Sequence, residues 1–229
     1  MLARAGVQLA RHRPPERRLA RFLGENDIGL VIDVGASCGQ FGSLLRRAGY
    51  RGRIVSFEPV SAAYEVLVKM ASKDADWESH RVALADKDGS GRMHVSKNLA
   101  SSSFLDICHP HLNAYPEAAY VGTEEVTTAR LDSIAAGFGI GDRPTMLKID
   151  VQGFTLQVLA GSAQTLGRVS CLQVEMSLVP LYANEPIMPT LLRYLDERGF
   201  ALTEIEPGFY ERDTGRLLQV DGRFVHTGH

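Results

Sequence analysis

The stretch Leu30-Val31-Ile32-Asp33-Val34-Gly35-Ala36-Ser37-Cys38-Gly39 decides the fold. It opens with a short apolar run that stops at a glycine, which is typical of a parallel strand buried on both faces. A helical pattern follows over about residues 40–48 and ends at Gly49, the residue type that most often closes a helix. A buried strand, a glycine turn and a helix in this order predict the first unit of an α/β fold.

The same alternation continues along the rest of the chain. Strands are predicted at 53–57, 78–84, 125–128, 145–149, 169–175, 200–205 and 223–226, and helices at 61–70, 132–136, 154–160 and 188–198. Residues 91–96 are predicted to form a hairpin arm, and 97–120 an excursion over the active-site face. We therefore predict a doubly wound, mostly parallel seven-stranded sheet whose two terminal strands form an antiparallel edge.

The N-terminal stretch is strongly basic. Within its first 22 residues a single acid, Glu16, accompanies six arginines: Arg4, Arg11, Arg13, Arg17, Arg18 and Arg21. Pro15, followed by apolar residues at helical spacing, predicts an amphipathic helix that closes near Asn26. We interpret residues 1–27 as a basic helical extension, through which the chain could form a homo-oligomer, and 28–229 as the main domain. The arginines are interpreted as a solvated helix face or a leader; a lid, an anchor for an anionic substrate and an organellar presequence are the alternatives.

Overall composition narrows the class of partner. Lysine and arginine total 25 against 27 acids, so the net charge of -2 gives no reason to expect nucleic acid or an anionic membrane, and a small molecule is the expected partner. The three widely spaced cysteines favour reduced thiols over a disulfide framework. Because we find neither a run of about eighteen apolar residues nor a secretory signal, we expect a cytoplasmic protein.

The loop after the first strand is predicted to bind a ligand through its backbone. Gly35 and Gly39 let the main chain approach a ligand closely, and the amides at the start of the next helix favour a carboxylate. Ser37 occupies the middle glycine position of the dinucleotide fingerprint, so a pyrophosphate is disfavoured. We predict that the methionine end of S-adenosylmethionine binds here; a purely structural turn is the alternative. The predicted contacts are Asp33, Gly35, Ala36, Ser37, Gly39 and Gln40.

The next two strands are predicted to hold the rest of this cofactor. Glu58 closes the second strand just before Pro59, where a carboxylate can accept both ribose hydroxyl protons; a solvated strand end is the alternative. The backbone of Ala83 and Leu84 is expected against the adenine. Asp86 is a candidate contact to the exocyclic amine, or an ordinary turn residue.

Catalytic candidates lie at the carboxyl ends of later strands. The strand 145–149 turns abruptly charged with Lys148 and Asp150, at the edge where open α/β sheets bind ligands; mutual charge pairing is the alternative. Glu175 ends the next strand and is expected beside Asp150, where the two acids could poise a base. A divalent metal ion is an alternative there that we do not predict. His226 is a further catalytic candidate and the loop 108–111 a candidate metal site, although a lone histidine is more often ordinary.

These segments, in this order, resemble the FkbM family of methyltransferases, named after an O-methyltransferase of macrolide biosynthesis. The matching pieces are Asp33 to Ala36 with Gly39 to Phe41, Phe57 to Pro59, Val82 to Leu84 with Asp86 and Gly89, Arg130 to Asp132, Leu147 to Gly153, and Val158 to Gly161. The resemblance covers about residues 28–206. It implies a class I, Rossmann-like methyltransferase fold, S-adenosylmethionine as donor and, usually, a hydroxyl acceptor on a sugar, polyketide or similar natural product. It also implies that Asp150 lies beside the transferring methyl group.

Two departures from the family pattern affect this interpretation. The family commonly has Asn where Ser37 stands and Glu where Gln152 stands, and the missing acid at 152 weakens any metal or base role nearby. The resulting hypothesis is in-line methyl transfer to an acceptor oxygen, with Asp150 taking the proton, helped by Glu175 or His226, and S-adenosylhomocysteine as product. A non-catalytic cofactor-fold binding subunit and a nicotinamide-dependent oxidoreductase are the alternatives. The sequence does not identify the acceptor.

Overall fold

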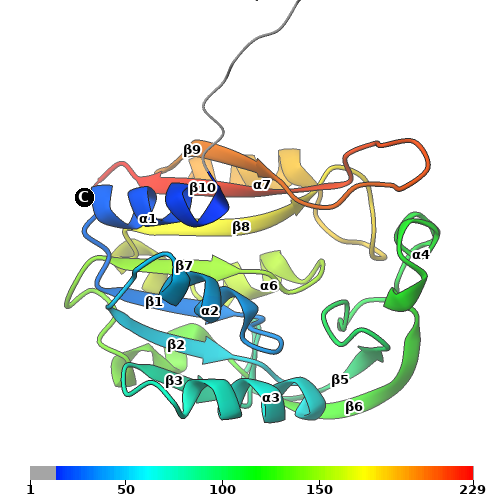
Figure 1. The fold of residues 1–229 in the computed structure, drawn as a ribbon, viewed down its shortest axis with the longest axis horizontal. Helices are drawn as coiled ribbons and strands as arrows, with labels where there is room; N and C mark the ends of the chain where they lie inside the picture. Colours follow the sequence, from blue (N-terminus) through cyan, green and yellow to red (C-terminus); the bar gives the residue numbers. More distant parts are fainter. Residues whose placement is uncertain (1–13, 229) are drawn as a thin grey trace, which may run out of the picture.

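The computed structural model describes residues 14–228, and within them seven strands form the main sheet. Their order is β3-β2-β1-β7-β8-β10-β9 (Figure 1). The strands are β1 (Leu30–Val34), β2 (Arg53–Phe57), β3 (Trp77–His80), β7 (Thr145–Ile149), β8 (Cys171–Ser177), β9 (Phe200–Pro207) and β10 (Gln219–His226). β10 pairs antiparallel with both β8 and β9, whereas the other pairings are parallel. The predicted doubly wound, mostly parallel sheet with an antiparallel edge is confirmed.

A second, three-stranded sheet carries residues that the sequence had placed elsewhere. Its order is β4-β6-β5, with β4 (Ala83–Leu84), β5 (Gly89–Ser96) and β6 (Tyr120–Ala129). The single strand predicted at 78–84 was wrong, because pairing with β2 stops at His80 and the next strand residues pair with β6 instead. The predicted arm at 91–96 pairs with β6 across the whole 97–119 excursion, so it is not a local hairpin.

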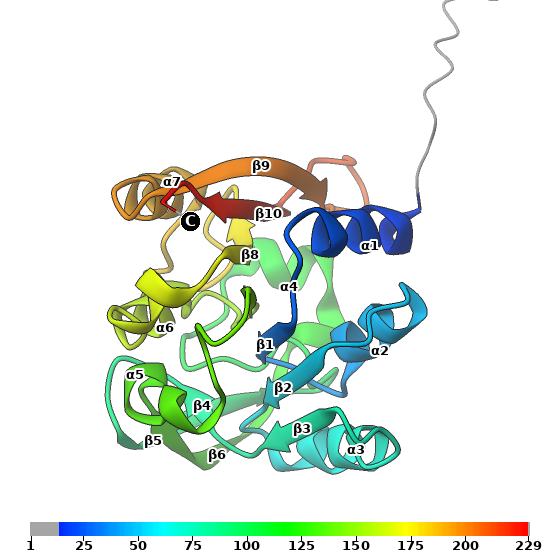
Figure 2. The ribbon, with the colours of Figure 1, turned by 90° about the vertical axis from the view of Figure 1, so that its left-hand side faces the viewer.

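Helices cover both faces of the main sheet (Figure 2). One face carries α1 (Pro15–Glu25), α2 (Gln40–Arg47) and α3 (Ser61–Ala71), and the other α5 (Leu131–Ile134), α6 (Thr155–Ala160) and α7 (Met188–Asp196). α4 (His109–Ala114) lies on the excursion, and 3-10 turns occur at Pro116–Ala118, Ala135–Gly137 and Thr165–Arg168. Among the described residues, no helix is both long and apolar enough to cross a membrane.

The N-terminal helix is a layer of the domain core. Leu19, Phe22 and Leu23 on α1 are buried in one cluster with Val31 of β1 and Met146 of β7. Residues on both sides of the expected boundary at residue 27 therefore belong to one hydrophobic cluster. Of the basic residues, Arg17 is exposed, as a solvated face predicts, whereas Arg4, Arg11 and Arg13 lie outside the described residues.

Two α1 arginines tie the helix to β9. Arg18 forms an ion pair with Glu206, and Arg21 one with Glu204. These contacts, together with the buried apolar face of α1, fix the helix over the edge of the sheet where the antiparallel strands lie. A role of α1 in homo-oligomerisation stays a prediction.

Candidate functional site

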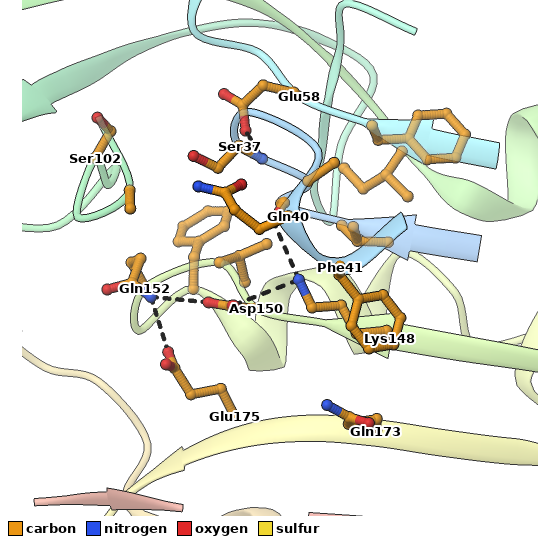
Figure 3. Close-up of a pocket in the computed structure, with 18 of the residues that line it drawn as sticks. Ser37, Gln40, Phe41, Glu58, Ser102, Lys148, Asp150, Gln152, Gln173 and Glu175 are labelled. Atoms are coloured by element: carbon orange, nitrogen blue, oxygen red, sulfur yellow. Dashed lines mark hydrogen bonds and ion pairs between the residues drawn. The ribbon is translucent and has the colours of Figure 1, made fainter. Parts of the chain in front are cut away.

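A cavity of about 600 Å³ opens at the carboxyl ends of the parallel strands, a volume in the usual range for small-molecule sites. Figure 3 shows some of the residues that line it. The glycine loop after β1 and the ends of β2, β7 and β8 form its floor, and residues 99–104 of the excursion lie over it. Pro15 at the start of α1 also reaches its wall. The cavity is thus assembled from segments spread over most of the chain.

Under α1 to α3, the sheet surface changes from apolar to polar toward this cavity. Because side chains alternate between faces, every second residue of adjacent strands belongs to one row. An apolar row comes first: Val31, Ile54, Met146 and Cys171. A polar row follows, in sheet order Ser56, Asp33, Lys148, Gln173, Arg223 and Glu204. A third row borders the cavity and contains five acidic residues: Glu58, Asp150, Glu175, Asp221 and Glu206.

The glycine loop is held tightly against its neighbours. Gly35 has φ +74, and a Cβ there would lie 1.8 Å from the backbone oxygen of Asp150, so no side chain fits. The backbone N–H groups of Gly35 and Ala36 both donate to the carbonyl of Phe57 at 3.0 Å. Gly39, with φ +86, then starts α2. The turn therefore brings bare backbone to the cavity wall, as the sequence predicted.

Glu58 is fixed by two backbone donors. Its Oε2 accepts from the N–H of Ser37 and its Oε1 from that of Val60, both at 2.8 Å. The side chain is buried, and burial raises the pKa of Glu58 to about 7 despite these hydrogen bonds. Each carboxylate oxygen keeps a free lone pair for a ligand hydroxyl on the cavity side.

Lys148 lies between two carboxylates. Its Nζ is 3.2 Å from Asp33 Oδ1 and 3.4 Å from Asp150 Oδ2, and it donates to the Gly35 carbonyl at 3.2 Å. Burial would lower the pKa of Lys148, but the two carboxylates outweigh burial and hold it above its ordinary value. The structure therefore shows the mutual charge pairing that was the alternative to a catalytic role for Lys148. An ammonium that stays protonated cannot accept a proton, so its role is to hold Asp33 and Asp150 in place.

Gln152 joins Asp150 to Glu175. Its Nε2 donates to Asp150 Oδ1 at 2.8 Å and to Glu175 Oε2 at 2.9 Å (Figure 3), while its Oε1 accepts from the Tyr182 hydroxyl at 2.7 Å. Burial, and then the Asp150 charge, raise the pKa of Glu175. Asp150 and Glu175 are therefore neighbours, as predicted. Gln152, which stands where the family commonly has Glu, is the donor that holds them together. Within residues 14–228, no group of three or more His, Cys, Asp or Glu side chains is arranged to hold a metal ion.

The antiparallel edge supplies three site residues that the sequence interpretation missed: Gln173, Asp221 and Arg223. Asp221 lies opposite Glu175 and Arg223 opposite Gln173 in the β8–β10 register. Burial raises the pKa of Asp221 to about 6. The predicted last strand began only at residue 223, so its acid was left in a loop. A signal was present, since Asp221 and Arg223 stand two apart and so belong on one face.

Several predicted contacts lie elsewhere. The catalytic prediction for His226 is wrong, because β10 runs antiparallel and its end lies at the amino edge of the sheet, where the His226 N–H donates to the Ser170 carbonyl at 2.9 Å. Asp86 is exposed and does not line the cavity, whereas Ala83 and Leu84 do. Of the loop residues 108–111, His111 is buried and packs against Tyr182.

The remaining predicted cofactor contacts divide into two groups. Ala36, Ser37, Gln40, Pro59 and Asp150 line the cavity. Asp33 and Gly39 do not line it. Asp33 is fully buried and forms an ion pair with Lys148, which does line the cavity. The Ser37 hydroxyl is buried without a hydrogen-bond partner among the described residues.

Comparisons with known proteins point to methyl transfer. The sequence model of the methyltransferase FkbM domain matches residues 33–202. The chain is similar to the 2-O-methyltransferase NoeI of Sinorhizobium fredii, 24% identical over 186 residues that cover 78% of this chain and 75% of NoeI. It is also similar to the methyltransferase sdnD of Sordaria araneosa, 24% identical over 196 residues that cover 76% of this chain and 74% of sdnD.

Solved structures share the fold. The magnesium protoporphyrin IX methyltransferase ChlM of Synechocystis, with bound SAM, superposes with a TM-score of 0.51 at 9% identity, covering 93% of this chain and 78% of ChlM. A Streptococcus pneumoniae protein in complex with S-adenosyl-L-methionine gives a TM-score of 0.52 at 14% identity, covering 93% of this chain and 72% of that one. At such identities the likeness establishes the fold alone.

Proposed function

The chain belongs to the FkbM methyltransferase family, and from that premise we propose that it transfers the sulfonium methyl group of S-adenosylmethionine to a hydroxyl oxygen of a small-molecule acceptor, such as a sugar, a polyketide or a similar natural product. The observation that carries the proposal is the pairing of a bare glycine turn with a buried, backbone-fixed Glu58 at the rim of one cavity. The glycine turn would hold the methionine end of S-adenosylmethionine, and Glu58 would hold its ribose.

The residues present fit this cofactor. Glu58 offers carboxylate lone pairs to the two ribose hydroxyls, and Ala83 and Leu84 provide an apolar wall for the adenine. Gly35 lines the cavity without a side chain, and the absence of a Cβ lets the turn pack against the backbone of Asp150. Ser37 stands where a dinucleotide-binding loop requires glycine, which argues against the oxidoreductase alternative.

Bound S-adenosylmethionine supplies an activated methyl group whose bond to sulfur breaks as the bond to oxygen forms, with the electron pair returning to sulfur to give S-adenosylhomocysteine. The protein must align the acceptor hydroxyl and remove its proton. Asp150 is the proposed proton acceptor, because it lines the cavity and is held from two sides by Lys148 and Gln152. Glu175, on the same amide of Gln152, is the proposed second acid.

Hydroxyl acceptors are favoured by the site and by one relative. A carboxylate suits a hydroxyl proton, and NoeI is a 2-O-methyltransferase. The proposal is tested by titrating S-adenosylhomocysteine and NAD calorimetrically, then assaying radiolabelled methyl transfer from S-adenosylmethionine to a hydroxyl-acceptor panel. We expect S-adenosylhomocysteine to bind and NAD not to bind. The wild-type protein should form O-methyl product, and the rate of its formation should fall at least about 100-fold in Asp150→Asn. NAD binding would support the oxidoreductase. Unchanged turnover of Asp150→Asn would remove that residue from the chemistry.

A further inference from the structure

A fixed hydrogen-bond donor faces the cavity away from the proposed cofactor contacts. Gln173 is only 6% exposed, and its Oε1 accepts from Arg223 Nε at 3.1 Å. Arg223 is itself held, with Nη1 2.7 Å from Glu204 Oε2 and Nη2 2.8 Å from Glu206 Oε2. An amide flip would break the bond to Arg223, so the Nε2 of Gln173 stays turned into the cavity (Figure 3).

This donor has no protein partner. Among the described residues, nothing accepts a hydrogen bond from Gln173 Nε2, although the side chain is more than nine-tenths buried. The Nε2 atom itself is accessible from the cavity, so a molecule bound there can accept its N–H. Its place on the cavity wall points to a ligand atom with a lone pair.

An open acceptor lies next to this donor. Across β8 and β10, Gln173 lies opposite Arg223, and Glu175 opposite Asp221, so the four side chains form a square on one face of the sheet. Asp221 lines the cavity, and its carboxylate forms no hydrogen bond or ion pair with residues 14–228. One corner of the cavity thus presents a donor and a carboxylate together.

The other carboxylates of the acidic row already have hydrogen-bond or ion-pair partners, whereas the carboxylate of Asp221 has none among the residues that the structure describes. In the acidic row, Asp150 contacts Lys148, and Glu175 accepts from the amide of Gln152. Glu206 is paired with two arginines, Arg18 and Arg223. Asp221 therefore has the only carboxylate of this row, within the described part of the chain, without a direct donor.

A hydroxyl group satisfies both open groups, since its oxygen accepts from an amide N–H and its proton is donated to a carboxylate. An ammonium would satisfy only Asp221 and would direct its N–H groups at the amide of Gln173. We infer that Gln173 and Asp221 form a second hydroxyl subsite, which selects acceptors carrying another hydroxyl besides the one that is methylated. The inference rests on the proposed function, because it assigns this corner to the acceptor.

The subsite lies close enough to Asp150 for one small acceptor molecule to reach both. Neighbouring strands are about 4.8 Å apart; Asp150 directly follows β7, Gln173 lies on the next strand, β8, and Asp221 lies on β10, one strand further. A single small molecule, such as a six-membered ring, can therefore carry both hydroxyls. The acceptor class is a diol or polyol, in contrast to a simple alcohol.

The test uses cyclohexane-1,2-diol, 1,3-diol and 1,4-diol, with cyclohexanol and 4-aminocyclohexanol as comparison probes. Binding to the protein saturated with S-adenosylhomocysteine is measured by saturation-transfer NMR. We expect at least one diol to bind about tenfold more tightly than cyclohexanol. Gln173→Leu should reduce that preference about 2- to 10-fold, and Asp221→Asn about tenfold or more, with the affinity for S-adenosylhomocysteine unchanged within twofold.

The outcomes separate this inference from the proposed function. Loss of S-adenosylhomocysteine binding in the wild-type protein would refute the proposed function. Binding of S-adenosylhomocysteine with no preference for any diol, or a diol preference that survives both substitutions, would overturn the subsite alone. Tighter binding of 4-aminocyclohexanol that Asp221→Asn abolishes and Gln173→Leu leaves intact would assign the corner to a cation instead. If Gln173→Leu does not fold, Gln173→Asn, which shortens the donor, takes its place.

Discussion

The affinity for S-adenosylhomocysteine should depend on pH through Glu58. Burial raises the pKa of Glu58 from 4.5 to about 7. If the ribose hydroxyls donate to the ionised carboxylate, the ligand binds that form, and its affinity falls about tenfold for each pH unit below 7. We therefore expect the dissociation constant to be roughly tenfold larger at pH 6 than at pH 8, and roughly a hundredfold larger at pH 5.

The same group should act on stability with the opposite sign. Its folded pKa lies above the unfolded value, so the contribution to stability is complete below pH 4.5 and is lost as pH rises to about 7. The shift corresponds to about 3 kcal/mol, at 1.36 kcal/mol per pKa unit. Ligand binding and stability of the free protein should thus respond to pH in opposite directions over this window.

The assay is isothermal titration calorimetry with S-adenosylhomocysteine from pH 5 to 8.5. In Glu58→Gln, binding should be weaker at every pH, because the amide presents an N–H to the backbone donor of Ser37 or Val60, and the dependence on pH should disappear. Glu117→Gln, at a surface ion pair with Lys97, is the matched control and should behave as wild type. A wild-type affinity that is constant from pH 5.5 to 7.5, or a slope that persists in Glu58→Gln, would refute the reasoning.

Three further predictions concern the framework of the site. Lys148→Met leaves the fully buried Asp33 carboxylate without its ion-pair partner and should lower the free energy of unfolding in urea by about 3–5 kcal/mol. The double variant with Asp33→Asn should regain most of this loss. An equal loss with Asp33 and with Asn at position 33 would contradict the pairing. Gly35→Ala, whose Cβ would lie 1.8 Å from a backbone oxygen, should abolish calorimetric binding of S-adenosylhomocysteine, whereas Gly49→Ala, at φ +88 with nothing within 4 Å, should keep it; equal affinities would argue against the steric account. Burial lowers the pKa of His111 from 6.5 to about 4, so stability should be complete above pH 6.5 and fall by up to about 3 kcal/mol toward pH 4, a loss that His111→Phe should remove in acid-unfolding curves.

The sequence predicted those parts of the site that are written within a few consecutive residues. The strand ending at Asp33, the turn at Gly35 and the strand-end acid Glu58 all carry local signals of hydrophobic period or backbone freedom, and they stand where they were expected. The charged end of β7 at Lys148 and Asp150 was equally readable, because an apolar strand that turns charged marks a sheet edge.

The errors arose where the answer depended on which strand pairs with which. His226 was assigned to the site although the last strand was predicted at an antiparallel edge; because β10 runs antiparallel to β8, its end lies at the edge of the sheet opposite the cavity. The same reversal brings Asp221, some 46 positions away in the chain, beside Glu175. The strand predicted at 78–84 broke after His80 because β6 competes for its second half.

By itself, the sequence determined the class of fold and the place of the cofactor loop, because strand period, helix spacing and the demand for glycine at positive φ are set by each residue and its nearest neighbours. Only the tertiary structure decided that Gln152 donates to two acids and that Gln173 and Asp221 face one cavity. Those relations depend on the register between strands far apart in the chain, which the packing of the whole sheet fixes and no short stretch of residues encodes.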